Sequence, residues 1–147
     1  MGSSNHSADV SQQENFGRLT VARFMVSDVQ TARPETTASQ IAAMMLEGFG
    51  AVPIVDATQR LIGIVTEQDL LTPLERNQKW REVSAKDVMT PNPYSVSPDT
   101  DLATLVHVLR ISNLIRVPVV VADEKLVGIV ARRDILRAYL DYGSNRK

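Results

Sequence analysis

The segment Leu126-Val127-Gly128-Ile129-Val130 repeats the pattern of Leu61-Ile62-Gly63-Ile64-Val65, which lies 65 residues earlier in the chain. The flanking motifs recur in the same order, at an offset of 65 from the Val-Pro motif onward and of 64 before it. Order and spacing hold over about fifty positions, which indicates two copies of one structural unit. The other matched pairs are Val52–Val55 with Val117–Val120, Asp69–Leu71 with Asp134–Leu136, Met25 with Met89, and Pro34 with Pro98.

Each copy predicts the same order of elements: strand, helix, strand, strand, helix. Apolar residues at helical spacing mark the first helix, and two short β-branched runs joined by a loop of four or five residues mark a hairpin. A second helix is expected to begin near Thr66 in copy one and near Ala131 in copy two. The expected first strands are 29–33 and 94–97, the first helices lie around 38–45 and 102–109, and the hairpin strands are 52–55, 61–65, 117–121 and 126–130.

The repeats also set the expected domain organisation. One copy alone has a size at which a single hydrophobic core is marginal, so the two copies are expected to pack as a pseudo-two-fold pair. The predicted fold class is α+β, with mixed sheets of the α/β type. Trp80, in the polar segment between the copies, is interpreted as a packing anchor. The expected boundaries are a flexible tail at 1–18, copy one at 19–75, a connector at 76–84, copy two at 85–140 and a C-terminal tail at 141–147.

Composition excludes several classes of function. The chain has 147 residues, no cysteine and two histidines, so disulfides, thiolate catalysis and cysteine-ligated metal sites are excluded and no histidine-based metal motif is present. A net charge of −1 gives no global attraction to nucleic acid or anionic membranes. No apolar run approaches the ~20 residues that a membrane span needs. These features predict a cytoplasmic protein without catalytic residues, a metal site or a membrane segment.

Taken in order, Asp87-Val88-Met89-Thr90-Pro91, Pro118-Val119-Val120 and Leu126–Val130 resemble a CBS domain, a family named for cystathionine β-synthase. Copy one carries Pro53–Asp56 and Gly63–Asp69 in the matching places. Two tandem copies resemble a CBS pair, also called a Bateman module, and the resemblance runs from about residue 21 to residue 139. It implies a free-standing regulatory module in which the CBS pair is the entire product.

The resemblance implies binding of an adenosine nucleotide in clefts between the repeats. AMP, ADP and ATP are the expected ligands, ahead of NAD and S-adenosylmethionine, and no cofactor is required. In the family, a Gly-x-x-Thr/Ser-x-x-Asp segment contacts the ribose. A carboxylate can accept hydrogen bonds from both ribose hydroxyls. Copy one has this segment complete as Gly63, Thr66 and Asp69. Copy two has Ala131 in place of the hydroxyl residue before Asp134, so the second site is expected to be weaker.

Thr66 and Asp69 also fit a helix-capping pattern, with Thr66 at the N-cap and an acid three residues later. Copy two weighs against capping as the reason for the acid, because Asp134 is present where no Ser or Thr precedes it. Within the resemblance, the ribose contact is favoured for Asp69. Capping by Thr66 does not exclude that contact.

Each site implied by the resemblance joins the helix start of one copy to the first strand and Val-Pro segment of the other. In site one, apolar residues would enclose adenine, and Arg116 would either contact a phosphate or remain a solvated surface residue. In site two, Arg133 would supply charge that Ala131 cannot. Site one comprises Thr66, Asp69, Ser95, Ile115, Arg116, Val117 and Pro118, and site two comprises Thr31, Gly50, Ala51, Val52, Pro53, Arg133 and Asp134.

Three functions are left open by the sequence. The leading one is a non-enzymatic ligand sensor that signals to an unidentified regulated protein, and that forms a homodimer through the helices around Met44 and Val106. The second is an interaction scaffold that binds no nucleotide. The third is a single-stranded nucleic-acid binder that uses Arg132, Arg133 and Arg137, which the net charge of −1 disfavours.

Overall fold

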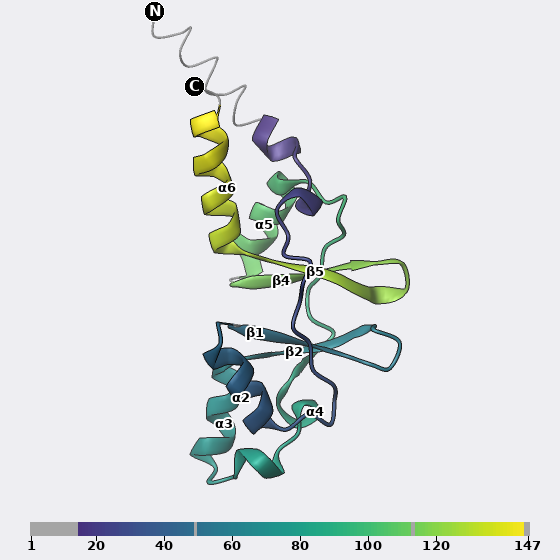
Figure 1. Ribbon diagram of the computed structural model, residues 1–147, viewed down its shortest axis with the longest axis vertical. Helices are drawn as coiled ribbons and strands as arrows, with labels where there is room; N and C mark the ends of the chain where they lie inside the picture. Colours follow the sequence, from purple (N-terminus) through teal and green to yellow (C-terminus); the bar gives the residue numbers. More distant parts are fainter. Residues whose placement is uncertain (1–14, 49, 113, 146–147) are drawn as a thin grey trace, which may run out of the picture. The chain divides into compact units, whose positions relative to one another are not determined.

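The computed structural model describes residues 15–48, 50–112 and 114–145, which are drawn in colour in Figure 1. These residues form two compact units. Unit 1 comprises the described residues up to 27, residues 96–119 and the described residues from 128 onward, and unit 2 comprises residues 28–95 and 120–127. Each unit therefore contains segments of both sequence repeats. Residues 1–14 of the expected N-terminal tail lie outside the described residues.

A three-stranded antiparallel sheet with the order β1-β2-β3 forms the centre of unit 2. Strands β1 (Ala51–Val55) and β2 (Leu61–Thr66) form the predicted hairpin, in which Ala51 pairs with Thr66. Strand β3 (Thr90–Pro91) pairs with β2, although it belongs in sequence to the second repeat. The start of repeat two therefore completes the sheet built by repeat one.

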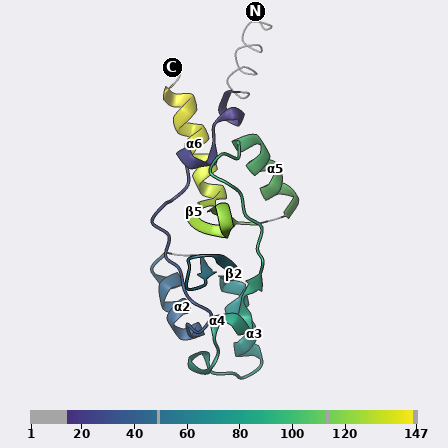
Figure 2. The same cartoon turned by 90° about the vertical axis from the view of Figure 1, so that its right-hand side faces the viewer.

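Helices α2 (Ala38–Leu46) and α3 (Glu67–Glu75) lie on one face of the β1–β2 hairpin (Figures 1 and 2). The 3-10 turn η2 (Trp80–Glu82) and the short helix α4 (Ala85–Val88) lead from α3 to β3. Both helices predicted for copy one are confirmed. The expected connector at 76–84 contains η2.

Apolar side chains from α2, β1 and β2 form the core of unit 2. Ile41, Val52 and Val65 have no exposed surface. Trp80 packs against this core, and its indole Nε1–H donates a hydrogen bond to the carbonyl of Leu70 at 2.9 Å. The prediction that Trp80 is a packing anchor is therefore confirmed.

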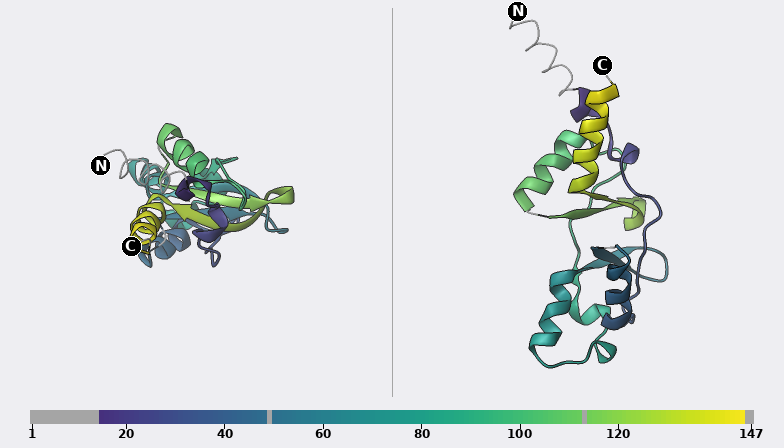
Figure 3. Two further views of the ribbon diagram at one scale, coloured as in Figure 1. Left: turned by 90° about the horizontal axis from the view of Figure 1, so that it is seen from above. Right: turned by 60° about the vertical axis from the view of Figure 1, so that its left-hand side comes forward.

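Strands β4 (Arg116–Val121) and β5 (Lys125–Ala131) form the second predicted hairpin, of which residues 116–119 and 128–131 belong to unit 1. Helices α5 (Leu102–Ser112) and α6 (Arg132–Asn145) lie on one face of this hairpin (Figures 1 and 3). The mixed α+β architecture predicted from the sequence is confirmed, and so are the hairpin and the two helices of copy two.

The tip of the β4–β5 hairpin belongs to unit 2. It contains the 3-10 turn η3 (Ala122–Glu124), and the guanidinium of Arg60 donates from Nε to the carbonyl of Asp123 at 3.0 Å. The backbone N–H of Leu126 donates to the carbonyl of Gln59 at 3.1 Å. These bonds tie the tip to the loop between β1 and β2.

The first strand predicted in each copy is reduced to a single bridge. Ala32 pairs in parallel with Ile54, and Val96 pairs in parallel with Val119. Proline has no N–H and cannot donate to a ladder, so Pro34 and Pro98 end the pairing soon after each bridge. One bridge residue holds the chain in place without a full strand.

One glycine in each unit is contacted by a methionine from the other repeat. The Sδ atom of Met89 lies against Gly63, where it would overlap a Cβ atom. The Sδ atom of Met25 lies 2.7 Å from the position that a Cβ on Gly128 would occupy. The close approach of methionine therefore explains the glycine in both copies of the repeated β-strand motif.

An aromatic cluster joins the N-terminal segment of unit 1 to α6. The ring of Phe16, which is 6% exposed, has its centroid 5.0 Å from that of Tyr139, 5.4 Å from that of Tyr142 and 6.0 Å from that of Phe24. These contacts explain why structured elements extend beyond the expected boundaries. Residues 15–18 are helical, and α6 continues through residue 145 instead of ending near residue 140.

Candidate functional site

The start of α3 holds the two residues that were expected to contact ribose in site one. The carboxylate oxygen Oδ2 of Asp69 accepts hydrogen bonds from the backbone N–H of Thr66 at 2.8 Å and from its hydroxyl at 3.1 Å. Thr66 has the extended backbone of an N-cap residue, with φ −108° and ψ 169°. Among the described residues, none donates to Oδ1 of Asp69. One carboxylate oxygen is therefore left for a ligand.

The start of α6 has the same arrangement without the hydroxyl. The backbone N–H of Ala131 donates to Oδ2 of Asp134 at 2.9 Å. The expectation that Asp134 weighs against a capping role is therefore wrong. Every residue except proline supplies a backbone N–H, so an acid can cap this position without a Ser or Thr before it.

A third helix start shows the same geometry outside both predicted sites. Oδ2 of Asp87 accepts from the hydroxyl of Ser84 at 2.8 Å and from its N–H at 3.3 Å, at the start of α4. These bonds, led by the hydroxyl, hold the pKa of Asp87 below its ordinary value. The Ser/Thr-x-x-Asp geometry is thus a capping device in its own right, and a ligand role for Asp69 depends on what surrounds it.

Four expected site-one residues lie around the start of β4 in unit 1. The carbonyl of Ile115 accepts from the N–H of Arg132 at 3.0 Å, which places Ile115 beside the start of α6. The side chain of Ile115 is 59% exposed, whereas Val117 and Pro118 are buried and Arg116 is partly exposed. Ile115 is therefore the apolar member of this group whose side chain is open in the structure.

Most expected site-two residues lie in unit 2. Thr31, which is partly exposed, precedes Ala32, whose N–H donates to the carbonyl of Pro53 at 3.0 Å. The β1 residues 51–53 are buried. Because Ala51 pairs with Thr66, the site-two strand adjoins the helix start of site one within the same unit.

Each predicted site takes some of its residues from unit 1 and the others from unit 2. Within unit 2 the structure brings the start of α3 beside β1, and within unit 1 it brings Ile115 beside the start of α6, whereas the placing of Ser95 beside Thr66 and the joining of the two units' residues remain predictions. Unit 2 holds Thr66, Asp69 and Ser95 of site one with Thr31, Gly50, Ala51, Val52 and Pro53 of site two, and unit 1 holds Ile115, Arg116, Val117 and Pro118 of site one with Arg133 and Asp134 of site two.

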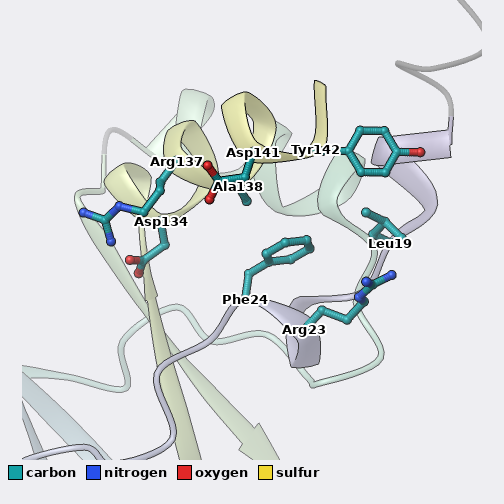
Figure 4. A pocket seen from close by; sticks show the side chains of 8 residues that line it. All are labelled: Leu19, Arg23, Phe24, Asp134, Arg137, Ala138, Asp141 and Tyr142. Atoms are coloured by element: carbon teal, nitrogen blue, oxygen red, sulfur yellow. The ribbon is translucent and has the colours of Figure 1, made fainter. Parts of the chain in front are cut away.

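Each unit also has a pocket that sequence reasoning missed. The pocket of unit 2 has a volume of about 280 Å³ and includes Asp69, and the pocket of unit 1 has a volume of about 320 Å³ and includes Asp134 (Figure 4). The two pockets occupy equivalent places in the repeats, so comparing the copies position by position was the signal that could have found them. Equivalent lining pairs are Arg23 and Asp87, Phe24 and Val88, Asp134 and Asp69, Arg137 and Thr72, and Asp141 and Arg76.

Across residues 15–48, 50–112 and 114–145, no group of three or more His, Asp or Glu side chains is placed to hold a metal ion. In that same part of the chain, every helix is too short or too polar to span a membrane.

Both repeats match one known protein family. The CBS domain family matches the chain at residues 21–76 and again at residues 85–141. The protein MK0525 of Methanopyrus kandleri is 37% identical over 121 residues, which cover 81% of this chain and 62% of that protein. The chain therefore spans less than two thirds of the length of that relative.

Two solved structures of CBS pairs are similar to the chain over most of its length. CBSX2 of Arabidopsis thaliana in complex with AMP is 29% identical with a TM-score of 0.75, and the match covers 84% of this chain and 98% of that one. The CBS domain pair of MJ0100, in complex with 5′-methylthioadenosine and S-adenosyl-L-methionine, is 26% identical with a TM-score of 0.75, covering 87% and 98%. With both repeats matched, the chain belongs to the CBS domain family, as a protein with two tandem CBS domains.

Proposed function

We propose that the chain is a non-enzymatic sensor that binds an adenosine nucleotide at the start of α3. AMP, ADP and ATP are the proposed ligands, ahead of NAD and S-adenosylmethionine. The complexes of CBSX2 with AMP and of MJ0100 with two adenosine compounds support this ligand class. The observation that carries the proposal is the carboxylate of Asp69, fixed through Oδ2 and open at Oδ1.

The start of α3 offers two kinds of contact to such a ligand. Oδ1 of Asp69 accepts a hydrogen bond from a ribose hydroxyl, and the bond from Thr66 to Oδ2 holds the carboxylate in place for it. The first N–H groups of this nine-residue helix have no carbonyl partner inside the helix, and the helix dipole favours an anion at this end. Phosphate oxygens therefore suit the position beside the ribose.

Residues of unit 1 complete the proposed site. Ile115, with its exposed side chain, would cover adenine, and Arg116 would meet a phosphate. Site two is proposed as the weaker one, because Ala131 lacks the hydroxyl of Thr66. The exposed Arg133 would supply a positive charge in its place.

Ligand occupancy is proposed to alter how the CBS pair contacts a separate regulated protein in the cytoplasm. A ligand shifts a protein between two states only by binding one of them more tightly. The chain is also proposed to form a homodimer through helix faces that include Met44 of α2 and Val106 of α5. Exposed apolar side chains support contact with a partner, among them Leu71 on α3 and Leu136 and Leu140 on α6, which are 60%, 66% and 71% exposed.

These same exposed residues favour a second candidate function, a scaffold that binds a protein partner and no nucleotide. A third candidate, binding of single-stranded nucleic acid, would use Arg132, Arg133 and Arg137. All three are exposed on α6, but the net charge of −1 disfavours this function.

A thermal-shift panel on ligand-free protein separates the three functions, with AMP, ADP, ATP, NAD, S-adenosylmethionine and a short RNA as ligands. A ligand at about 100 times its dissociation constant adds about 2.7 kcal/mol to the free energy of unfolding. We expect the unfolding temperature to rise with an adenosine nucleotide and to stay unchanged with RNA. No shift with any nucleotide at about millimolar concentration would contradict the sensor and favour the scaffold.

A further inference from the structure

The pocket of unit 1 lies between α6 and the segment around the 3-10 turn η1 (Val21–Arg23). Helix α6 contributes Asp134, Arg137, Ala138 and Asp141, which share one helix face because they are spaced three or four residues apart. Figure 4 shows the ring of Phe24 turned toward this face. The volume of about 320 Å³ lies at the low end of the ~300–1,000 Å³ typical of small-molecule sites.

The apolar wall of this pocket is held in place. Phe24 is partly exposed, and its ring packs on the buried ring of Phe16 at a centroid distance of 6.0 Å. The guanidinium of Arg23 lies 6.0 Å from the centroid of the Phe24 ring. The buried methyl group of Ala138 lines the wall on α6. Phe24 and Ala138 therefore give the pocket an apolar side against which a flat apolar group can pack.

The polar groups of the pocket carry both signs of charge. Arg23 and Arg137 contribute positive charge, and Asp134 and Asp141 contribute negative charge. Within the described residues, Arg137 and Asp141 have no hydrogen-bond or ion-pair partner on their side chains. Asp134 uses only Oδ2, for the N–H of Ala131. Cationic and anionic groups are thus both available to a ligand.

The equivalent pocket of unit 2 lacks this combination. Val88 stands in the place of Phe24, and the lining includes no aromatic side chain. The acids Asp69, Glu82 and Asp87 face a single cation, Arg76. Of these two pockets, only that of unit 1 therefore combines an aromatic side chain with equal numbers of positive and negative side chains.

We propose that the pocket of unit 1 binds an aromatic α-amino acid. The ring stacks on Phe24, the carboxylate bonds to the guanidinium of Arg137, and the ammonium bonds to the carboxylate of Asp141. A balanced lining favours a zwitterion, whereas the two carboxylates would repel a phosphate group. This site is distinct from the proposed nucleotide site one and shares only Asp134 with site two.

Isothermal titration of the full chain with L-phenylalanine tests the proposal. We expect saturable binding that weakens at least tenfold in Arg137→Gln, because a charge-assisted hydrogen bond is lost. Arg132→Gln removes the same charge from the same helix outside the pocket and should bind as the wild type does. Phe24→Leu, checked for folding by circular dichroism, should also weaken binding.

A ligand series tests the zwitterion directly. 3-Phenylpropionate lacks the ammonium and 2-phenylethylamine lacks the carboxylate, so each should bind at least tenfold more weakly than L-phenylalanine. The proposal is overturned if L-phenylalanine, L-tyrosine and L-tryptophan all fail to bind with a dissociation constant below about 10 mM. It is also overturned if Arg137→Gln and Arg132→Gln bind L-phenylalanine equally.

A parallel titration with AMP keeps this proposal separate from the proposed function. AMP binding at site one should be unchanged by Arg137→Gln. If the wild-type protein binds AMP but no aromatic amino acid, the pocket proposal alone is overturned. If it binds L-phenylalanine but no adenosine nucleotide, the nucleotide sensor alone is overturned.

Discussion

Oδ2 of Asp69 accepts a hydrogen bond from the backbone N–H of Thr66 at 2.8 Å, and this bond closes the first turn of α3. Oδ2 of Asp134 makes the equivalent bond to Ala131 at 2.9 Å, at the start of α6. Each acid therefore has a structural role before any ligand arrives. Stability and binding must be measured separately when either residue is changed.

The capping role predicts that Asp134→Ala lowers the free energy of unfolding by about 1 kcal/mol, the typical effect of losing a helix cap. Urea denaturation followed by far-UV circular dichroism measures the change. Asp141→Ala, on an exposed side chain of the same helix, is the matched control and should change stability by less than about 0.5 kcal/mol. Equal urea midpoints for Asp134→Ala and the wild type would contradict the capping role.

The contact between Met89 and Gly63 predicts that Gly63→Ala destabilises the protein by about 1–3 kcal/mol, because the added methyl group overlaps the methionine side chain. A double-mutant cycle with Met89→Ala measures the coupling. The second alanine should recover part of the loss, since it removes the overlapping atoms. Additive effects of the two substitutions would show that the methionine does not explain the glycine.

The indole of Trp80 predicts a smaller effect for Trp80→Phe. This change keeps an aromatic ring against the core but removes the donor to the carbonyl of Leu70, which costs about 1 kcal/mol. Chemical denaturation should be followed by circular dichroism, because Trp80 is the single tryptophan and its replacement removes the tryptophan fluorescence signal. A variant as stable as the wild type would mean that the bond adds nothing.

Three hydrogen-bonded acids, Asp56, Asp87 and Asp101, predict a loss of stability in acid. Hydrogen bonds lower the pKa of Asp56, chiefly from the N–H of Arg60, and that of Asp101, chiefly from Thr104, as they do for Asp87. A lowered pKa means that the stabilisation is complete above the unfolded-state pKa of about 3.9 and is lost as pH falls through the folded value. Urea midpoints measured from neutral pH into acid should therefore fall mainly below about pH 4.

The combined variant Asp56→Asn, Asp87→Asn, Asp101→Asn is the test of that assignment. It should be less stable at neutral pH and should lose less stability in acid than the wild type. An unchanged acid dependence would assign the effect to other groups.

The repeated sequence predicted most of the fold, because its helices and hairpins carry long apolar patterns. It could not predict which hairpin the first segment of each repeat would join. Val26 forms a single antiparallel bridge to Ile129, and β3 has two residues, so neither pairing has a periodic pattern. The exchange of segments between the repeats became visible only in the structure.

The candidate site was predicted in part for a related reason. Thr66 and Asp69 stand out in the sequence because both are polar side chains at a helix start. The cap at Asp134 uses the backbone N–H of Ala131, which leaves no mark in the sequence. The pocket that includes Phe24 depends on contacts between residues over 100 positions apart, such as Phe16 with Tyr139.

Titration of AMP by calorimetry into Asp69→Asn and Asp134→Asn tests the central claim most directly. Asparagine can still accept the bond from the N-cap N–H, so each change removes the negative charge and one acceptor oxygen while the cap is kept. The proposed sensor predicts that Asp69→Asn weakens AMP binding at least tenfold and more than Asp134→Asn does. Wild-type affinity for AMP in Asp69→Asn, or an equal loss in the two variants, would contradict it.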